Sequence, residues 1–246
     1  TVSGKTITFA YKGLSYATNY TFALAAGSVA DLTDNTIQSD ITFSFTTKEK
    51  PAVTKALYDF IVPTDGSFTD ALAAAAKRSD SSKRFRIFIK QGDYKIPANE
   101  NSMVTGNDGK QYPSATTYLN TPNVSIIGES NENTSITNTV PAVECDNGFG
   151  MANVLEGIGH GDVLSLESSA VNTYFQDIKM YSSMGDGKGR DIVLNDKSNK
   201  TICKNVNLWA YQDTYVSNNQ KGRFYFEGGI LRGNTDYLCG KGDVYY

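Results

Sequence analysis

The first fifty residues alternate hydrophobic and polar positions with a period of two. Such runs occur at residues 6–9, 20–24 and 41–45. Gly, Asn and Asp separate them, as is typical of antiparallel strands with one buried face. A charged segment ending in proline, Lys48–Pro51, follows and predicts a linker. We therefore expect a small β domain at residues 1–49 and a second domain at residues 50–246.

The second domain opens with a segment that predicts a helix. Ser67 and Asp70 have the spacing of a capping box, in which each side chain bonds the backbone of the other residue. The alanine-rich run 71–77 follows, and alanine has the highest helix propensity. A short apolar strand is expected next, at residues 85–89.

From about residue 122 the chain becomes a series of short apolar strands separated by polar turns. Three segments, FQDIKMYS, CKNVNLWA and FEGGILRG, can be superposed on their central apolar residues, Ile178, Val206 and Ile230. These residues are 28 and then 24 positions apart. A repeat of this length with one or more strands per unit is typical of a stacked β-solenoid. An all-β fold is therefore predicted, with an evenly spaced β-sandwich as the alternative.

Composition narrows the classes of partner. The net charge of −3 provides no basic field for nucleic acid, so no nucleic-acid partner is expected. No apolar run approaches the ~18 residues that span a membrane, so membrane insertion is not expected either. Cys145, Cys203 and Cys239 lack the CxxC spacing of zinc sites. We interpret them as buried free thiols.

Two aspartates in the last part of the chain carry the candidate chemistry. Asp213 and Asp236 are 23 residues apart, close to one turn of the predicted solenoid. Residues one turn apart lie on adjacent strands, roughly 5 Å from each other. Two carboxylates this close resist ionising together, which yields one ionised nucleophile or base and one protonated acid. The structural alternative is a pair of turn aspartates that cap backbone amides. Nearby aromatic side chains suited to packing against sugar rings are Tyr211, Tyr215, Tyr225 and Tyr237.

The motifs around these aspartates resemble a known family. YQDT at 211–214, RFY at 223–225 and GNTDYLCG at 233–240 are similar to the core of pectin methylesterases, carbohydrate esterases built on a right-handed parallel β-helix. A weaker similarity covers residues 57–246. The resemblance implies that fold for the second domain, with the predicted helix capping its N-terminal end. Residues 1–49 resemble the C-terminal half of a bacterial Ig-like domain.

The resemblance implies a role for each matched residue. Asp236 would be the nucleophile on the C6 methyl ester of a galacturonate, and Asp213 the acid that protonates departing methanol and then the base that activates water. Gln212 would donate a hydrogen bond to the oxyanion. Arg190 stands where the family has a second oxyanion glutamine and can also donate, and the alternative is a surface arginine with no catalytic role. Tyr211, Tyr215 and Tyr237 would contact substrate. No metal or cofactor is implied.

The sequence also departs from the family. It stops at Tyr246, before the Leu-Gly-Arg-Pro-Trp segment whose Arg holds the nucleophile and whose Trp lines the sugar cleft. We therefore expect a longer polypeptide, with the β-helix lacking its C-terminal turns here. Cys203 matches one of the family's paired cysteines, but Gly229 occupies the other position. The expected protein is a monomer that acts on pectin homogalacturonan and is secreted, periplasmic or at the cell surface.

Two other functions are compatible with the sequence. The first is a calcium-dependent pectate or polysaccharide lyase on the same fold. Its candidate ligands would be Asp186, Asp191 and Asp196. The second is a non-catalytic protein in which both domains bind polysaccharide. Release of an unsaturated product indicates a lyase, and binding without methanol release indicates a binding protein.

Overall fold

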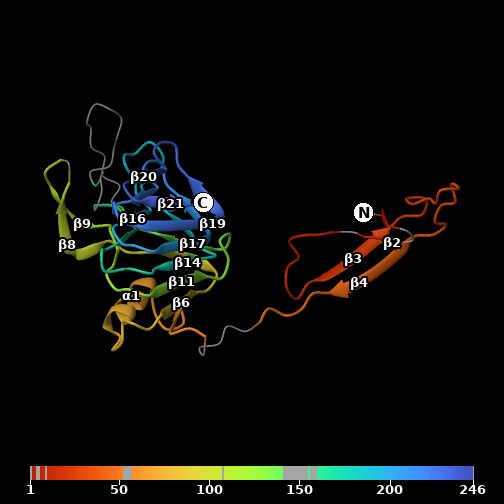
Figure 1. The fold of residues 1–246 in the computed structure, drawn as a ribbon, viewed down its shortest axis with the longest axis horizontal. Helices are drawn as coiled ribbons and strands as arrows, with labels where there is room; N and C mark the ends of the chain where they lie inside the picture. The colour runs from red at the N-terminus through yellow and green to blue at the C-terminus, as the bar shows by residue number, and fades with distance from the viewer. Residues whose placement is uncertain are drawn as a thin grey trace. The chain divides into compact units, whose positions relative to one another are not determined.

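The structure is a computed structural model that describes residues 2–3, 6–8, 10–51, 57–106, 108–140, 155 and 160–245. The chain divides into two compact units, Thr1–Val53 and Thr54–Tyr246. Figure 1 shows a small β unit near the N-terminus and a larger unit of stacked strands.

The first unit contains antiparallel strands, as the alternating pattern predicts. Its main feature is a hairpin whose register runs from Asn19 opposite Thr46 to Leu24 opposite Ile41. Rings pair across the two strands, because side chains at every second position share one face. The ring centroids of Phe22 and Phe43 are 5.2 Å apart. The strands of this unit are β1 (Val2–Ser3), β2 (Thr6–Ile7), β3 (Asn19–Leu24) and β4 (Ile41–Thr46). Its identity as part of an Ig-like domain stays a prediction.

The second unit is a parallel β-helix, which agrees with the predicted solenoid and not with a sandwich. Its described strands form three faces. Face A contains β5 (Phe60–Val62), β6 (Phe85–Ile89), β11 (Val124–Gly128), β14 (Tyr174–Gln176), the first halves of β17 (Thr201–Trp209) and β19 (Arg223–Arg232), and β21 (Asp243–Tyr245). Face B contains β7 (Gly92–Lys95), β12 (Thr134–Thr137), β15 (Lys179–Tyr181) and the second halves of β17 and β19. Face C contains β10 (Tyr118–Leu119), β13 (Leu164–Leu166), β16 (Leu194–Asp196), β18 (Tyr215–Ser217) and β20 (Leu238–Gly240). An antiparallel hairpin, β8 (Asn99–Thr105) and β9 (Gln111–Ser114), projects from the stack.

The predicted helix is α1 (Phe68–Lys77), and its capping box is confirmed. The Ser67 amide donates to Asp70 Oδ2 at 2.9 Å, and the Asp70 amide donates to Ser67 Oγ at 3.1 Å. The helix buries Phe68, Ala71 and Leu72 in the core of the β-helix unit. Figure 1 shows it beside β6, at the start of the stack, where it covers the end of the core.

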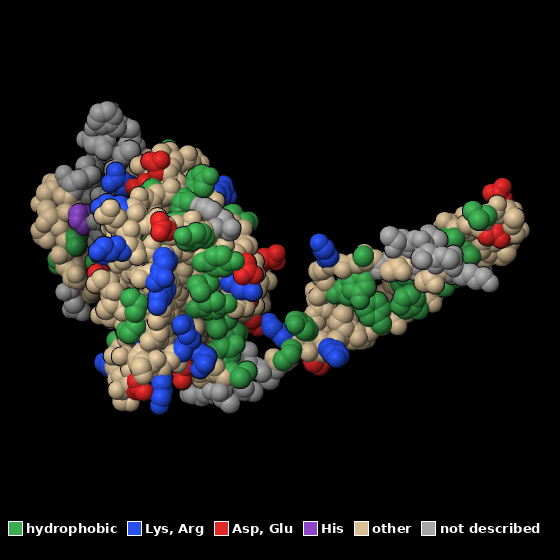
Figure 2. Space-filling model, in the orientation of Figure 1, with side chains coloured by type: hydrophobic (Ala, Val, Ile, Leu, Met, Phe, Trp, Pro, Cys, Tyr) green, Lys and Arg blue, Asp and Glu red, His purple; other side chains and the backbone are tan. Residues whose placement is uncertain are grey.

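The core is built from inward side chains that stack from turn to turn. On face A one such column is fully or almost fully buried: Ile87, Ile126, Phe175, Cys203 and Phe226. Cys203 is therefore a buried free thiol, as predicted. Cys145 lies outside the described residues. The outward side chains also form columns, and Figure 2 shows basic and hydrophobic ones gathered over the strands that face the viewer.

The corner between faces A and B corrects one sequence interpretation. Asn205 and Gly228 turn this corner with φ of 53° and 64°. Val206 then pairs with Gly229, and not with Ile230 as the superposition assumed. Ile230 pairs with Asn207 and is 51% exposed. Glycine occupies the inward position because a Cβ there would lie 2.2 Å from the Val206 carbonyl oxygen.

Candidate active site

The β-helix places Asp213 and Asp236 on adjacent turns, at the entrances to β18 and β20. Gln212 and Thr235 form a parallel bridge, and the Asp213 amide donates to the Thr235 carbonyl at 3.2 Å. Both aspartates adopt left-handed backbone angles, with φ of 63° and 48°. Such angles are uncommon outside glycine and often occur at functional sites. The two residues that the 23-residue spacing singled out therefore lie side by side along the stack.

Asp213 is the more enclosed of the two carboxylates. It is 8% exposed, whereas Asp236 is exposed. Its Oδ2 lies 2.7 Å from Arg190 Nε, an ion pair formed without the alignment of a hydrogen bond. Burial raises the pKa of Asp213 and the charge of Asp236 raises it further, while Arg190 and the Cys239 thiol oppose this rise. The environment therefore favours the protonated form of Asp213 more than water does.

Cys239 is a neighbour of the pair that the sequence did not reveal. The thiol donates to Asp213 Oδ1 at 3.7 Å. Burial raises the pKa of Cys239 to about 11, with further contributions from the charges of Asp213 and Asp236. The thiol is therefore neutral near pH 7 and acts as a hydrogen-bond donor. Cys239 is free, as predicted, but only half-buried. Its position three residues after Asp236 is the one signal that could have linked it to the site.

Arg190 and Gln212 lie on the two successive turns that precede the turn of Thr235. The Asp191 amide donates to the Gln212 carbonyl at 3.1 Å, which sets the register between these turns. The side chain of Arg190 is 42% exposed, and its buried Nε faces Asp213. Gln212 is half-buried beside it. The structure thus gathers the four residues predicted to be catalytic, Arg190, Gln212, Asp213 and Asp236, at one end of face C.

Asp191 has a role that the sequence interpretation did not assign. Its Oδ1 accepts the amides of Tyr211 at 2.9 Å and Gln212 at 2.8 Å. The residue is 1% exposed, and burial raises its pKa to about 7. Asp191 therefore holds the peptide that leads directly into Asp213.

We expect Asp191→Asn to change how stability depends on pH. Asp191 is protonated in both folded and unfolded chains below pH 4. Above that it ionises more readily when unfolded, so wild-type stability falls between about pH 4 and pH 7. The loss can reach about 4 kcal/mol for three pKa units. Denaturant unfolding followed by the fluorescence of Trp209, the single tryptophan, measures this.

The Asn variant keeps an acceptor for the two amides and lacks the titrating group. Its free energy of unfolding should therefore rise relative to wild type as the pH increases from 4 to 7. Asp243→Asn, at an exposed position, is the matched control. Its free energy of unfolding should differ from that of wild type by the same amount at every pH. A constant difference between Asp191→Asn and wild type across this range would contradict the expectation.

The aromatic residues predicted to contact substrate do not share one environment. Tyr237 is 49% exposed and Tyr211 is half-buried, so both can reach a ligand. Tyr215 is fully buried, donates to Asp196 Oδ2 at 3.0 Å and packs edge-on against Phe226. A contact between Tyr215 and a polysaccharide is therefore excluded, and that prediction is wrong. Tyr225, also considered, lies on face A in register with Ile202.

The three proposed calcium ligands do not form one group: Asp186 and Asp191 line the same hollow, but Asp196 does not. Asp191 is engaged by two amides, and Asp196 lies inside the β-helix, bonded to Ser198 and Tyr215. Asp186 is exposed on the preceding loop. The described residues contain no group of three or more His, Cys, Asp or Glu side chains placed to hold a metal ion. This arrangement offers no support for a lyase that uses those three aspartates.

Comparisons with known proteins agree with the motifs. Over 178 residues the chain is 26% identical to Pectinesterase 1 of Solanum lycopersicum, covering 72% of this chain and 27% of that protein. It is 22% identical over 204 residues to Pectinesterase/pectinesterase inhibitor 18 of Arabidopsis thaliana, covering 81% and 31%. The curated relatives are pectinesterases. The chain thus spans about a third or less of their length. No protein-family profile matches the chain.

Solved structures of pectinesterases share the fold. The pectin methylesterase from carrot superposes with a TM-score of 0.56 at 18% identity, over 80% of this chain and 52% of that one. Pectin methylesterase PemA from Erwinia chrysanthemi gives 0.52 at 19% identity, over 79% and 54%. The β-helix is thus the fold of these pectinesterases.

The described part of the chain has no helix with the length and apolar character needed to cross a bilayer.

Proposed function

We propose that this chain hydrolyses the C6 methyl esters of homogalacturonan, releasing methanol and leaving free carboxylates. The observation that carries the proposal is the pairing of a buried Asp213 with an exposed Asp236 on the next turn. Two carboxylates in unlike environments suit one acid and one nucleophile. The pectinesterase relatives support the substrate class.

In the first step the ionised Asp236 attacks the ester carbonyl, and the carbonyl oxygen becomes a tetrahedral oxyanion. Gln212 donates to this oxyanion, with Arg190 providing positive charge nearby; one such donor commonly contributes a few kcal/mol. The C–O bond to the methoxy group then breaks, and Asp213 gives its proton to methanol. The product is an anhydride between the galacturonate and Asp236.

In the second step water hydrolyses the anhydride. Asp213, now ionised, takes a proton from the attacking water, and Asp236 leaves as a carboxylate. The enzyme returns to its starting protonation state, with the proton again on Asp213. The raised pKa of Asp213 supports this assignment, because the acid must hold its proton when methanol departs.

Arg190→Gln tests the electrostatic part of this mechanism. The variant restores the amide expected from the family and removes the charge beside Asp213. Because Arg190 lowers the pKa of Asp213, that pKa should rise in the variant. In the pH profile of kcat/KM, the fall at alkaline pH reports loss of the Asp213 proton. This fall should shift to higher pH by about one unit. Lys188→Gln makes the same charge change on the exposed loop and should leave the fall at the same pH. If the alkaline fall of kcat/KM in Arg190→Gln stays at the same pH or shifts to lower pH, Asp213 is not the acid.

The proposed setting follows from the substrate. Homogalacturonan is an extracellular polysaccharide, so we place the protein in a secreted, periplasmic or cell-surface location, acting as a monomer. Binding of long polymers requires an open surface, and the proposed nucleophile Asp236 is exposed.

The reaction products test the proposed function. The chain is incubated with highly methylated pectin in two parallel reactions, one with a calcium chelator and one with added calcium. Methanol and new carboxylates should appear in equal amounts, because each hydrolysed ester gives one of each. An unsaturated sugar product that depends on calcium would indicate a lyase. Binding to pectin with neither product would indicate a non-catalytic protein.

A further inference from the structure

The outer surface of face B carries basic and aromatic side chains in two aligned rows. Tyr181, Trp209 and Arg232 are in register on three successive strands. Lys179, Asn207 and Ile230 form the row two residues earlier. The residues between these rows point inward, and Met180 and Leu208 are fully buried. The alternation therefore directs both rows away from the core.

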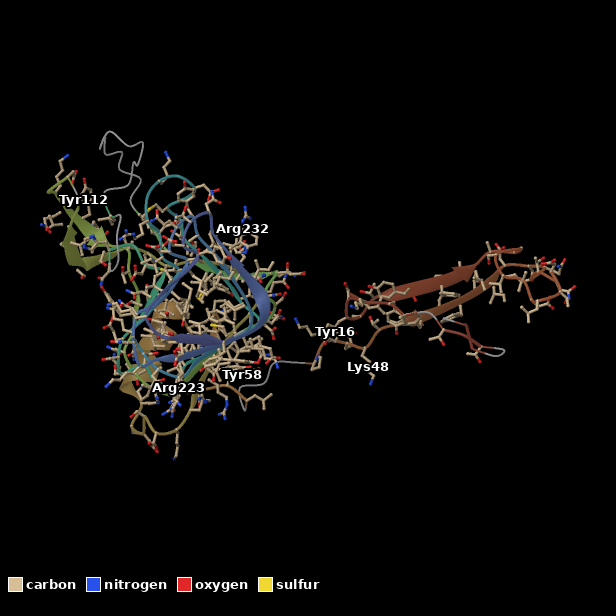
Figure 3. The ribbon with its side chains drawn as sticks, turned by 45° about the horizontal axis from the view of Figure 1, so that its top comes forward. Tyr16, Lys48, Tyr58, Tyr112, Arg223 and Arg232 are labelled. Carbon is tan, nitrogen blue, oxygen red and sulfur yellow. The ribbon has the colours of Figure 1, made fainter. Side chains whose placement is uncertain are left out.

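The two cations of this surface are held against one aromatic ring. Lys179 Nζ lies 4.8 Å from the Trp209 ring centroid and 5.1 Å from that of Tyr181. Arg232 Cζ lies 5.2 Å from the Trp209 centroid. Neither cation forms an ion pair with a carboxylate of the described residues. Their positive charge is therefore available to a ligand. Figure 3 labels Arg232 at the end of β19, well separated from Arg223 at its start.

Two hollows adjoin at Trp209 on this surface. The larger, of about 510 Å³, is also lined by Asn131, Lys179 and Asn207. The smaller, of about 200 Å³, is also lined by Tyr181, Tyr211 and Arg232. We call them together the face B groove. Each hollow also has acidic lining residues, Glu132 in the first and Asp186 and Asp191 in the second, and each contains one of the two cations beside the shared tryptophan.

We propose that the face B groove binds a de-esterified, acidic stretch of a galacturonate chain. The uronate carboxylates contact Lys179 and Arg232, which charge-assisted hydrogen bonds favour. Sugar rings pack against the exposed edges of the aromatic row and Ile230. Asn131 and Asn207 hold this wall of the groove: the Asn207 amide donates to the Asn131 carbonyl at 3.0 Å, and the Asn131 amide donates to Asn205 Oδ1 at 3.0 Å. A methyl-esterified sugar has no charge for these cations, so the groove selects the acid form.

This site is distinct from the aspartate pair, although it extends toward it. The smaller hollow reaches Tyr211 and Asp191, and Asp191 holds the peptide that enters Asp213. The identity of the glycan rests on the proposed function; the groove contributes two cations without carboxylate partners among the described residues and an aromatic row, which favour an anionic sugar polymer. Binding at the groove needs no turnover and can be measured separately from it.

The single tryptophan provides the readout, because Trp209 lies at the centre of the groove. The full chain is titrated with polygalacturonate while tryptophan emission is recorded, and neutral dextran serves as the ligand control. Emission should change in a saturable way with polygalacturonate only. Lys179→Gln and Arg232→Gln should each weaken binding by about three- to fivefold, as expected for exposed charge contacts. Lys221→Gln, on the exposed turn between β18 and β19, should bind like wild type.

Two results would overturn the proposal: no change in emission with polygalacturonate, or unchanged affinity in both Lys179→Gln and Arg232→Gln. Methanol release from methylated pectin is measured on the same preparations. Methanol release without polygalacturonate binding would contradict the groove proposal and support the esterase proposal. Binding that depends on Lys179 and Arg232, without methanol release, would support the groove proposal and contradict the esterase proposal.

Discussion

Asp236→Asn should lower the rate of methanol release by at least about 10³-fold, because the nucleophile of the proposed reaction is lost. The fall should lie in kcat, with little change in KM. Asp236 is exposed, so the substitution should change the free energy of unfolding by no more than about 0.5 kcal/mol. Steady-state methanol assays and denaturant unfolding measure the two quantities on the same preparation.

The matched control is Asp243→Asn, which makes the same chemical change at another exposed position, on β21 of face A. It should retain wild-type activity. Asp236→Asn that keeps a tenth or more of the wild-type rate would show that Asp236 is not the nucleophile, whatever the second aspartate does.

Gly229→Ala should destabilise the β-helix unit by about 3 kcal/mol, the scale of a strained position where an added group meets fixed backbone. The new Cβ would lie 2.2 Å from the Val206 carbonyl oxygen and 2.5 Å from its nitrogen, and φ is +82°. These contacts are with backbone, which cannot move aside as a side chain can. Unfolding in urea, followed by Trp209 emission, should show a lowered midpoint for this unit.

Gly228→Ala is the neighbouring comparison. Its φ is +64°, but no atom lies within 4 Å of the added Cβ. Only the left-handed backbone penalty applies, of about 1 kcal/mol. If the two alanine variants lose equal free energy of unfolding, the close approach of residue 229 to Val206 does not contribute to the requirement for glycine. The same contact explains why glycine replaces the apolar residue that the repeats show at Ile178 and Val206.

Local patterns in the sequence predicted much of the fold. The capping box and the alanine run predict α1, and alternation predicts the hairpin of β3 and β4. The 23-residue spacing of Asp213 and Asp236 placed them one turn apart, because parallel stacking converts sequence distance directly into position. The repeat spacing gave a wrong prediction at Ile230. Gly229, one residue earlier, pairs with Val206 and takes the inward position.

The environments of single side chains were harder to predict. All three residues of β18 are buried, so no alternation distinguishes Tyr215 from an outward tyrosine. Asp191 looks like any loop aspartate until the register places it beneath the amides of Tyr211 and Gln212. The contact between Cys239 and Asp213 likewise depends on two turns meeting. Such contacts are set by three-dimensional stacking and have no local signature.

The pairing of Asp213 with Asp236 is tested most directly by a double-mutant cycle on methanol release. The four proteins are wild type, Asp213→Asn, Asp236→Asn and the double variant, assayed on methylated pectin at one pH. If the two carboxylates act as a unit, the double variant should be no slower than the slower single variant. Losses that multiply across the two positions, or wild-type release from either single variant, would contradict the paired-carboxylate mechanism.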